Sequence, residues 1–286
     1  MKADKRFAGL PLDFWAHVRT ISESIGYSQK KTGTILVPTI DDVKNAMEMR
    51  GLSYTHLVSP SNDKPTPTGR LLCDYFEYRA KVLNDYVRHR LMDANRAKYV
   101  FDKLKDELKP SCPLPMNKQT GDKKAPAYLT GIVNMLIEAN AKNCNYDLNP
   151  RQLTSFTRNG IPLRTLARWV DGVFPATNNP VALWEIKEYY YTTTFGSRIA
   201  DGVYETLLDG MELKELRDNV QAEALHYLII DAYHTWWDMG RSYLCRIIDT
   251  LSMGYIDEAL FGYEVVERLP TIVRHWVKVY KSRSLK

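Results

Sequence analysis

The chain has 286 residues, of which 44% are hydrophobic and 26% charged, with a net charge of +5. This composition excludes an intrinsically disordered protein, and four cysteines without a CxxC pair argue against a disulfide framework or a zinc site. No apolar run is long enough to span a membrane and the first residues lack the apolar core of a signal peptide. We therefore expect a soluble cytoplasmic protein without membrane contacts.

The first part of the chain, residues 1–108, is predicted to be mostly helical. Helical periodicity covers residues 14–25 and 40–50, and residues 34–37 form a short β-prone piece between them. After a turn-rich run at residues 59–69, apolar residues recur at three- and four-residue steps as far as Leu104. This spacing predicts one long amphipathic helix, followed by a proline-containing linker at residues 109–126.

The positive charge is concentrated in that helix and the linker. From Arg70 to Lys124 there are 13 Lys and Arg against 8 Asp and Glu, whereas the rest of the chain is balanced at 26 against 26. One interpretation is an ordinary solvated helix face. The other is contact with a polyanion, because clustered cations gain affinity by releasing counterions from phosphates. In that case Arg88, Arg90 and Arg96 are candidate DNA-binding residues.

Residues 127–286 are predicted to form an α/β core. A helix is predicted over residues 127–141, with Glu138 in its last turn. Residues 151–166 fit no single pattern. Residues 169–174 and 181–191 are rich in aromatic and β-branched side chains and are separated by Pro and Asn, which indicates strand, turn and strand.

The last part of the chain completes this core. Residues 196–208 are predicted to be helical, and the apolar run at residues 225–237 indicates a buried central strand. Helices are expected from residue 240 to residue 276, interrupted near Gly254, Gly262 and Pro270. This order of elements predicts a mixed central sheet flanked by helices.

A group of acidic and basic residues lies in the two predicted strands. Asp171 begins the first strand, and Glu185 and Lys187 share one face of the second because side chains alternate along a strand. A hairpin would bring Asp171 beside them. Carboxylate oxygens bind Mg²⁺, which activates water and neutralises developing charge in phosphodiester hydrolysis. A nearby lysine orients the nucleophile or stabilises the transition state.

The [DE]xK pattern alone is not specific, because it occurs four more times. The other occurrences begin at Asp42, Glu107, Asp122 and Glu212. Only the pattern at Glu185 lies in a β-prone apolar strand that follows a second strand beginning with Asp-Gly. The chain also lacks a phosphate loop, a dinucleotide fingerprint and a GxSxG elbow, which argues against the common nucleotide-binding and acyl-transfer chemistries.

The stretch from residue 169 to residue 208 resembles the PD-(D/E)xK nuclease superfamily, and type II restriction endonucleases in particular. The resemblance implies that Asp171 and Glu185 bind the metal and that Lys187 is the catalytic lysine. It also implies a further acidic metal ligand from an earlier helix, for which Glu138 is the candidate, and a DNA contact at Arg198 on the helix after the motif. In one position the sequence departs from the pattern, since Val170 and not Pro precedes Asp171.

Together with these residues, the resemblance implies a Mg²⁺-dependent, sequence-specific endonuclease for double-stranded DNA that leaves 5′-phosphate ends, in the cytoplasm of a prokaryote. Cutting both strands of a symmetric site requires two active centres, so we expect a homodimer. One alternative is a structure-selective DNA repair nuclease. Another is a non-catalytic DNA-binding protein in which Glu185 and Lys187 form an ordinary ion pair.

Overall fold

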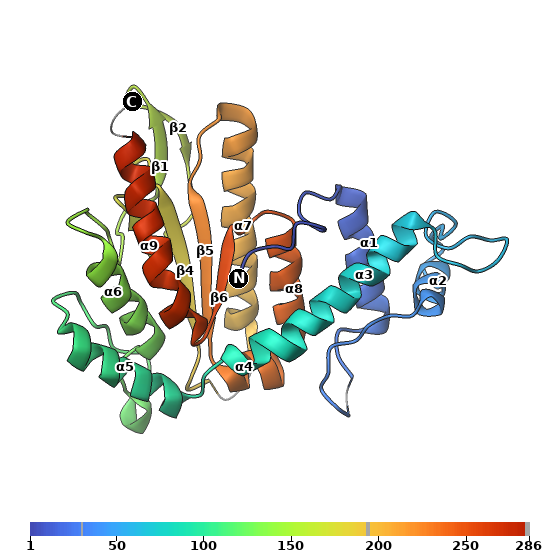
Figure 1. Cartoon of the computed structure of the whole chain (residues 1–286), viewed down its shortest axis with the longest axis horizontal. Helices are drawn as coiled ribbons and strands as arrows, with labels where there is room; N and C mark the ends of the chain where they lie inside the picture. The colour runs from blue at the N-terminus through green and yellow to red at the C-terminus, as the bar shows by residue number, and fades with distance from the viewer. Residues whose placement is uncertain (30, 193–194, 284–286) are drawn as a thin grey trace.

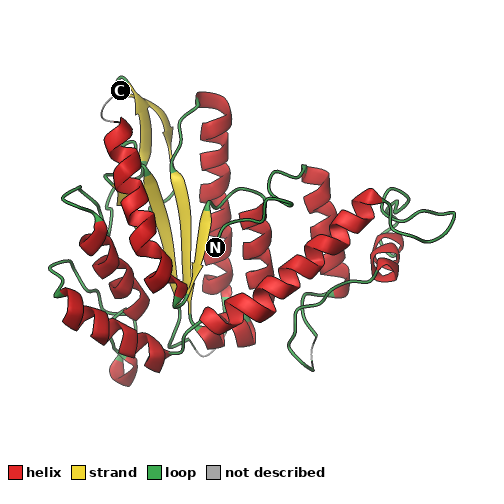
Figure 2. Cartoon of the chain, in the orientation of Figure 1, coloured by secondary structure: helices red, strands yellow, loops and turns green. Residues whose placement is uncertain are grey.

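The computed structural model describes residues 1–29, 31–192 and 195–283, except for the side chain of Arg198. The fold is mixed α/β, with a helical N-terminal region beside a helix-flanked sheet (Figures 1 and 2), as the sequence predicts. In the part of the chain that the structure describes, every helix is too short or too polar to cross a bilayer.

The N-terminal helices project to one side of the sheet (Figure 1). They share a small apolar core around Phe7, Trp15 and Tyr75. The short piece at residues 34–37 is not a strand but makes a single bridge between Ser28 and Ile35. The helices of this region are α1 (Leu12–Ile25), α2 (Ile40–Glu48) and α3 (Pro67–Lys81).

The prediction of one long basic helix is wrong, because the helix breaks at residues 91–93. Helix α3 continues through a π-helical turn, η1 (Val82–Val87), into α4 (Arg88–Arg90), and α5 (Ala94–Leu108) starts separately. The Met92 N–H donates to Asp231 at 2.8 Å, and the Met92 carbonyl accepts from the Tyr233 N–H at 2.8 Å. These bonds fix an extended connection, after which the Asp93 side chain caps α5.

The main sheet has four strands in the order β3-β4-β5-β6. Strands β3 and β4 are antiparallel, whereas β5 lies parallel to both β4 and β6, so the prediction of a central buried strand is confirmed. The short strand β6 was not predicted. The four strands are β3 (Gly172–Phe174), β4 (Ala182–Glu188), β5 (Leu225–Asp231) and β6 (Glu258–Phe261).

The ambiguous stretch before the sheet forms a separate hairpin of β1 (Ser155–Arg158) and β2 (Ile161–Thr165). The last part of the predicted central strand is instead a π-helical turn, η3 (His234–Met239), because β5 ends at Asp231. A single 3₁₀ turn, η2 (Gly121–Lys123), interrupts the linker.

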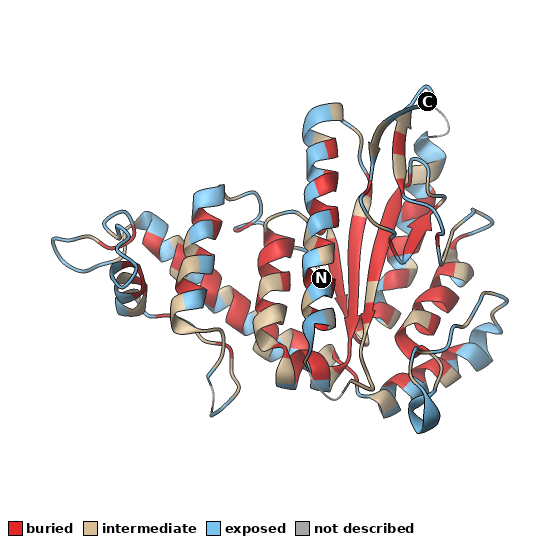
Figure 3. Ribbon diagram, turned by 180° about the vertical axis from the view of Figure 1, so that it is seen from behind, coloured by how far each residue is buried: buried red, intermediate tan, exposed pale blue. Residues whose placement is uncertain are grey.

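Helices cover both faces of the sheet, so its central strands are buried (Figure 3). The core on one face joins the even-numbered β4 residues Ala182 and Trp184 to α5, α6 and α9. Helices α7 and α8 pack on the other face. The four helices not yet delimited are α6 (Tyr128–Asn140), α7 (Ser197–Val220), α8 (Arg241–Ser252) and α9 (Glu264–Arg283).

Candidate active site between β4 and α7

The three residues predicted to form the site lie together in the structure. The β3–β4 register pairs Gly172 with Trp184, which places Asp171 beside Glu185. The Ile186 N–H donates to Asp171 Oδ2 at 2.7 Å, and the Asp171 N–H donates to Glu185 Oε1 at 3.3 Å. Lys187 Nζ donates to Glu185 Oε2 at 2.7 Å. The expected hairpin therefore brings both carboxylates and the ammonium group to one place.

Arg168 is a member of this cluster that the sequence analysis missed. Its Nη1 lies 2.9 Å from Glu185 Oε1 and 2.6 Å from Asp209 Oδ2. Its Nη2 lies 3.3 Å from Glu205 Oε2. The guanidinium group therefore joins the acid of β4 to two acids of α7.

Helix α7 contributes its two acids through helical spacing. Glu205 and Asp209 are four residues apart, which places them on the same side of the helix, toward β4. Glu205 Oε2 also accepts a hydrogen bond from Lys187 Nζ at 3.0 Å. This acidic i, i+4 pair directly after the ExK strand is the sequence signal from which both residues could have been found.

Gly202 leaves room for the lysine. A Cβ atom at this position of α7 would lie 3.1 Å from Lys187 Cδ and 3.3 Å from Lys187 Cε, closer than an ordinary packing contact. The missing side chain thus lets the lysine stem pass between β4 and the helix, where only 7% of Lys187 is exposed.

The electrostatic environment differs among the acids. Burial opposes ionisation of Glu185, but the charges of Lys187 and Arg168 outweigh it and hold the pKa of Glu185 below its usual value. Loss of hydration, followed by repulsion from Glu185, raises the pKa of Asp171 to about 6. The same two causes raise the pKa of Asp209 to about 7. Asp171 and Glu205 are the acids that reach solvent, whereas Glu185 is 0% exposed.

The cluster has more negative than positive groups. Four carboxylates, those of Asp171, Glu185, Glu205 and Asp209, face the two cations Arg168 and Lys187. Asp209 Oδ1 is buried and has no hydrogen-bond partner within the described residues. The excess of carboxylate oxygens and this unpaired buried oxygen suit a hard divalent cation such as Mg²⁺.

The side chains are nevertheless not arranged as a preformed metal site. Across residues 1–29, 31–192 and 195–283, no three His, Cys, Asp or Glu side chains are grouped so that they could hold a metal ion. Arg168 and Lys187 lie against both oxygens of Glu185. A metal ion at this carboxylate would therefore require the Arg168 guanidinium group to move away from it.

The prediction that Glu138 completes the metal site is wrong. Glu138 lies at the end of α6, on the face of the sheet opposite to Lys187 and α7. Its carboxylate accepts hydrogen bonds from the backbone N–H and the hydroxyl group of Ser111. A helix on the other face of the sheet cannot direct its side chain to the cluster.

The candidate DNA-binding arginines have intramolecular contacts. Arg90 pairs with Glu267, the guanidinium carbon of Arg88 lies 5.4 Å from the ring centre of Trp237, and that of Arg96 lies 5.1 Å from the ring centre of Tyr263. Arg88 and Arg96 remain exposed, so DNA contact by these residues stays a prediction. The side chain of Arg198 lies outside the described residues.

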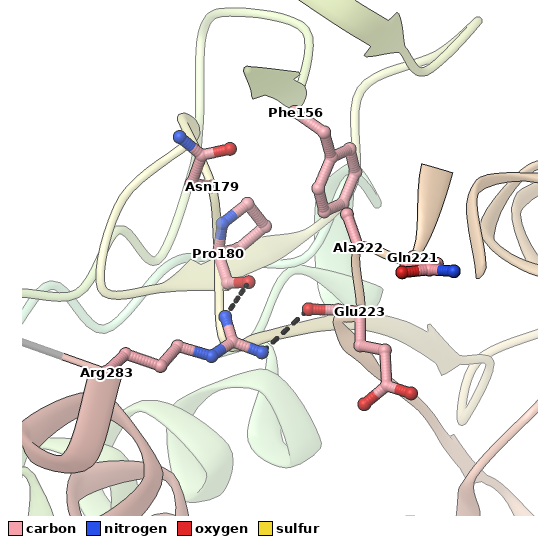
Figure 4. A pocket seen from close by; sticks show the side chains of 7 residues that line it. All are labelled: Phe156, Asn179, Pro180, Gln221, Ala222, Glu223 and Arg283. Atoms are coloured by element: carbon pink, nitrogen blue, oxygen red, sulfur yellow. Dashed lines mark hydrogen bonds between the residues drawn. The ribbon is translucent and has the colours of Figure 1, made fainter. Parts of the chain in front are cut away.

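A separate cavity of about 320 Å³ opens near the starts of β4 and β5 (Figure 4). Arg283 donates to the backbone carbonyls of Pro180 at 3.2 Å and Glu223 at 2.8 Å. The Glu223 carboxylate points away from this guanidinium group (Figure 4). Arg283 is thus paired with backbone carbonyls, and among the lining residues it forms no ion pair with a carboxylate like those of the cluster at Glu185.

Comparison with known proteins divides the chain at the end of the α3–η1 helix. Residues 1–86 match the family described as Domain of unknown function (DUF7690). No curated protein and no solved structure matches the chain. Residues 92–276, more than half of the chain and including the cluster at Glu185, match a second family. The chain therefore belongs to the family described as Domain of unknown function (DUF7687).

Proposed function

We propose that this protein is a Mg²⁺-dependent endonuclease that hydrolyses phosphodiester bonds in double-stranded DNA, resembling a type II restriction enzyme. The observation that carries the proposal is the convergence of Asp171, Glu185 and Lys187 at one edge of the β3–β4 hairpin. Two acids can hold a divalent metal ion and a lysine beside them can stabilise charge on the phosphate, so the three groups suit metal-assisted phosphodiester hydrolysis.

The cost of the cluster supports a functional role. Burying charged groups beside a sheet removes their hydration, and a buried ion pair is often no more stable than apolar residues of similar size. The fold does not need charge here, because the neighbouring surface of the same sheet is filled with Leu183, Leu228 and other apolar residues. A free-energy cost without a structural benefit is expected at a catalytic site.

In this mechanism Asp171 and Glu185 would hold Mg²⁺. Asp209 lies nearby, since Arg168 donates hydrogen bonds to both Asp209 and Glu185. The bound ion would supply charge neutralisation and a more acidic water. Lys187 is held as a cation, since Glu185 and Asp171 outweigh the effect of burial and keep its pKa above the usual value. Its ammonium group can therefore stabilise negative charge that develops on the phosphate.

Arg168 would give up one of its three carboxylate partners during the reaction. While it contacts Glu185, it neutralises part of the excess negative charge. On metal binding its guanidinium group can remain with Glu205 and Asp209, which it already contacts. It would then stay within the site as a second cation near the phosphate.

The proposal includes sequence-specific cutting that leaves 5′-phosphate ends, in a prokaryotic cytoplasm, and a homodimer that places one centre on each DNA strand. The purified protein should convert supercoiled plasmid DNA into discrete linear fragments in Mg²⁺ and leave it intact in EDTA. Cutting restricted to branched DNA would favour the structure-selective repair nuclease. A gel shift of uncut DNA would favour a non-catalytic DNA-binding protein.

A further inference from the structure

A second cavity, also of about 320 Å³, lies between the N-terminal helices and the sheet-covering helices. Helix α1 and the residue Tyr27 form one wall, and α7 and α8 form the other. The two walls belong to the two segments that match different families, residues 1–86 and residues 92–276. Clefts of this volume at the contact between two such units are common places for small-molecule binding.

The acids in this cleft are already paired. Asp249 is buried and accepts hydrogen bonds from the Tyr75 hydroxyl at 2.5 Å and from Arg79 Nη1 at 3.1 Å. Glu23 forms an ion pair with Arg50 at 2.8 Å. Neither carboxylate therefore leaves an unbalanced negative charge in the cleft.

The arginines of the cleft are not paired with acids. Within the described residues, Arg246 has no carboxylate partner, and its contacts are with three tyrosines. Its Nη1 donates to the Tyr204 hydroxyl at 2.7 Å, its side chain also hydrogen-bonds with Tyr27, and its guanidinium carbon lies 4.8 Å from the ring centre of Tyr243. Arg19 lies on α1 and forms no ion pair among the described residues, and its Nη2 lies 3.6 Å from Met253 Sδ. The cleft therefore has two guanidinium groups whose charge no carboxylate within the described residues neutralises, which suits an anion.

The remaining lining is apolar or aromatic. Val203 and Leu207 are one helical turn apart on α7, and Tyr204 and Tyr27 add rings beside Arg246. Such a surface accepts a flat hydrophobic group, while the arginines take an anionic one. The volume is at the lower end of the range for ligand cavities, which favours a molecule with one ring system.

We propose that this cleft is a binding site for a nucleoside monophosphate or a similarly sized aromatic phosphate. The phosphate would lie between Arg19 and Arg246, and the base would lie against the Val203–Leu207 surface and the tyrosine rings. Such a ligand would touch both family segments at once and stabilise their contact beside the buried Arg79–Asp249 pair. This site is separate from the cluster at Glu185 and does not depend on the proposed nuclease activity.

Calorimetric titration of the full chain in EDTA, without DNA, tests the proposal. Adenosine monophosphate and thymidine monophosphate are the probes, and inorganic phosphate and adenosine are the comparison ligands. We expect at least one of the two nucleotides to bind saturably with a dissociation constant below about 1 mM. Binding should be at least about tenfold weaker for inorganic phosphate and for adenosine, because each offers only one half of the ligand.

Two variants locate the binding. Arg246→Gln removes the charge inside the cleft, and Arg19→Gln removes an exposed charge whose loss should leave the fold intact. Each should weaken nucleotide binding at least about tenfold. Arg70→Gln, at an exposed arginine of α3 outside the cleft lining, and Asp171→Ala, in the candidate active site, should bind like the wild type.

Three results would overturn the proposal. The first is the absence of saturable binding by either nucleotide. The second is that both single variants, Arg19→Gln and Arg246→Gln, fold and bind the nucleotide as tightly as the wild type. The third is inorganic phosphate binding as tightly as the nucleotides, since the ring would then make no contact. Loss of DNA cleavage in Asp171→Ala with retained nucleotide binding would show that the two proposals stand or fall separately.

Discussion

The two faces of β4 differ although they belong to one strand of seven residues. On the α9 face, Trp184 stacks on Trp276 with ring centres 5.4 Å apart and planes at 9°. On the α7 face, Glu185 and Lys187 meet Arg168 and Glu205. Strands covered on both sides by helices are usually apolar on both faces. The apolar face therefore contributes to the core of the fold. On our proposal, the charged face serves catalysis instead.

The largest loss of stability is expected on the apolar face. Trp184→Ala removes a fully buried indole group that packs on Trp276 and on Gly172. It should lower the free energy of unfolding by about 4 kcal/mol, because a large cavity remains. Chemical denaturation followed by tryptophan fluorescence or circular dichroism measures this value. A loss below about 1 kcal/mol would show that this face does not carry the stability of the sheet.

A pH-dependent loss of stability, smaller than that of Trp184→Ala, is expected from Glu188 at the end of β4. Burial is the main cause that raises the pKa of Glu188 to about 7, although its carboxylate accepts hydrogen bonds from Thr130 at the start of α6. Between the usual pKa of about 4.5 and pH 7, the folded chain therefore binds more protons than the unfolded chain. Stability should fall as the pH rises through this window, by about 2 kcal/mol.

Denaturation curves collected from pH 4.5 to pH 7.5 measure the contribution of Glu188. In Glu188→Gln, which keeps an oxygen acceptor for Thr130, this part of the pH dependence should disappear. If the variant follows the wild-type curve throughout the window, the buried acid does not titrate there.

A small gain in stability, in place of a loss, is expected when the charges of the other face are removed. The double variant Glu185→Leu with Lys187→Met replaces a buried ion pair with apolar groups of similar size and leaves Arg168 paired with Asp209 and Glu205. It should abolish cleavage and keep or increase stability, by about 1 kcal/mol. Parallel denaturation and plasmid assays check both parts. A large loss of stability would mean that the charged pair is required for folding, which removes the contrast between the faces.

The sequence predicts the elements that depend on local pattern. The Asp-Gly start of β3, the turn and the alternating residues of β4 are enough to bring Asp171, Glu185 and Lys187 together. The apolar run at β5 is likewise enough to indicate the central strand. Strand β6 has only four residues, and its identity as a strand depends on pairing with β5, a long-range contact without a local signal.

The parts that the sequence does not predict depend on which face an element presents. Glu138 lies near the end of a helix that precedes the first core strand, as the resemblance requires. However, α6 packs on the face of the sheet opposite to Glu185 and Lys187. Arg168 precedes β3 and has no feature that separates it from a surface arginine. The break at Met92 results from hydrogen bonds with Asp231 and Tyr233, far away in the sequence.

The smallest effect is expected at Gly202, where the charged face meets α7. Gly202→Ala places a methyl group against the stem of Lys187, and the helix itself should gain about 1 kcal/mol of stability from the substitution. The displaced ammonium group should lower the cleavage rate about fivefold. Single-turnover cleavage rates of the variant and the wild type measure the effect. An unchanged rate would show that the position of the lysine stem is not critical.

The proposed catalytic role of Lys187 can be tested by comparing two lysines of the same chain that both occupy an ExK pattern. Lys187→Ala changes the lysine of the cluster, whereas Lys214→Ala changes a half-exposed lysine that pairs with Asp218 on α7. Cleavage of a DNA substrate that the wild type cuts is measured in Mg²⁺, and binding of the same DNA is measured in Ca²⁺. We expect Lys187→Ala to lose at least about a hundredfold in rate while it still binds DNA, and Lys214→Ala to cut like the wild type. Full cleavage by a folded Lys187→Ala protein would mean that this lysine takes no part in the reaction and that the cluster is not the active site we propose.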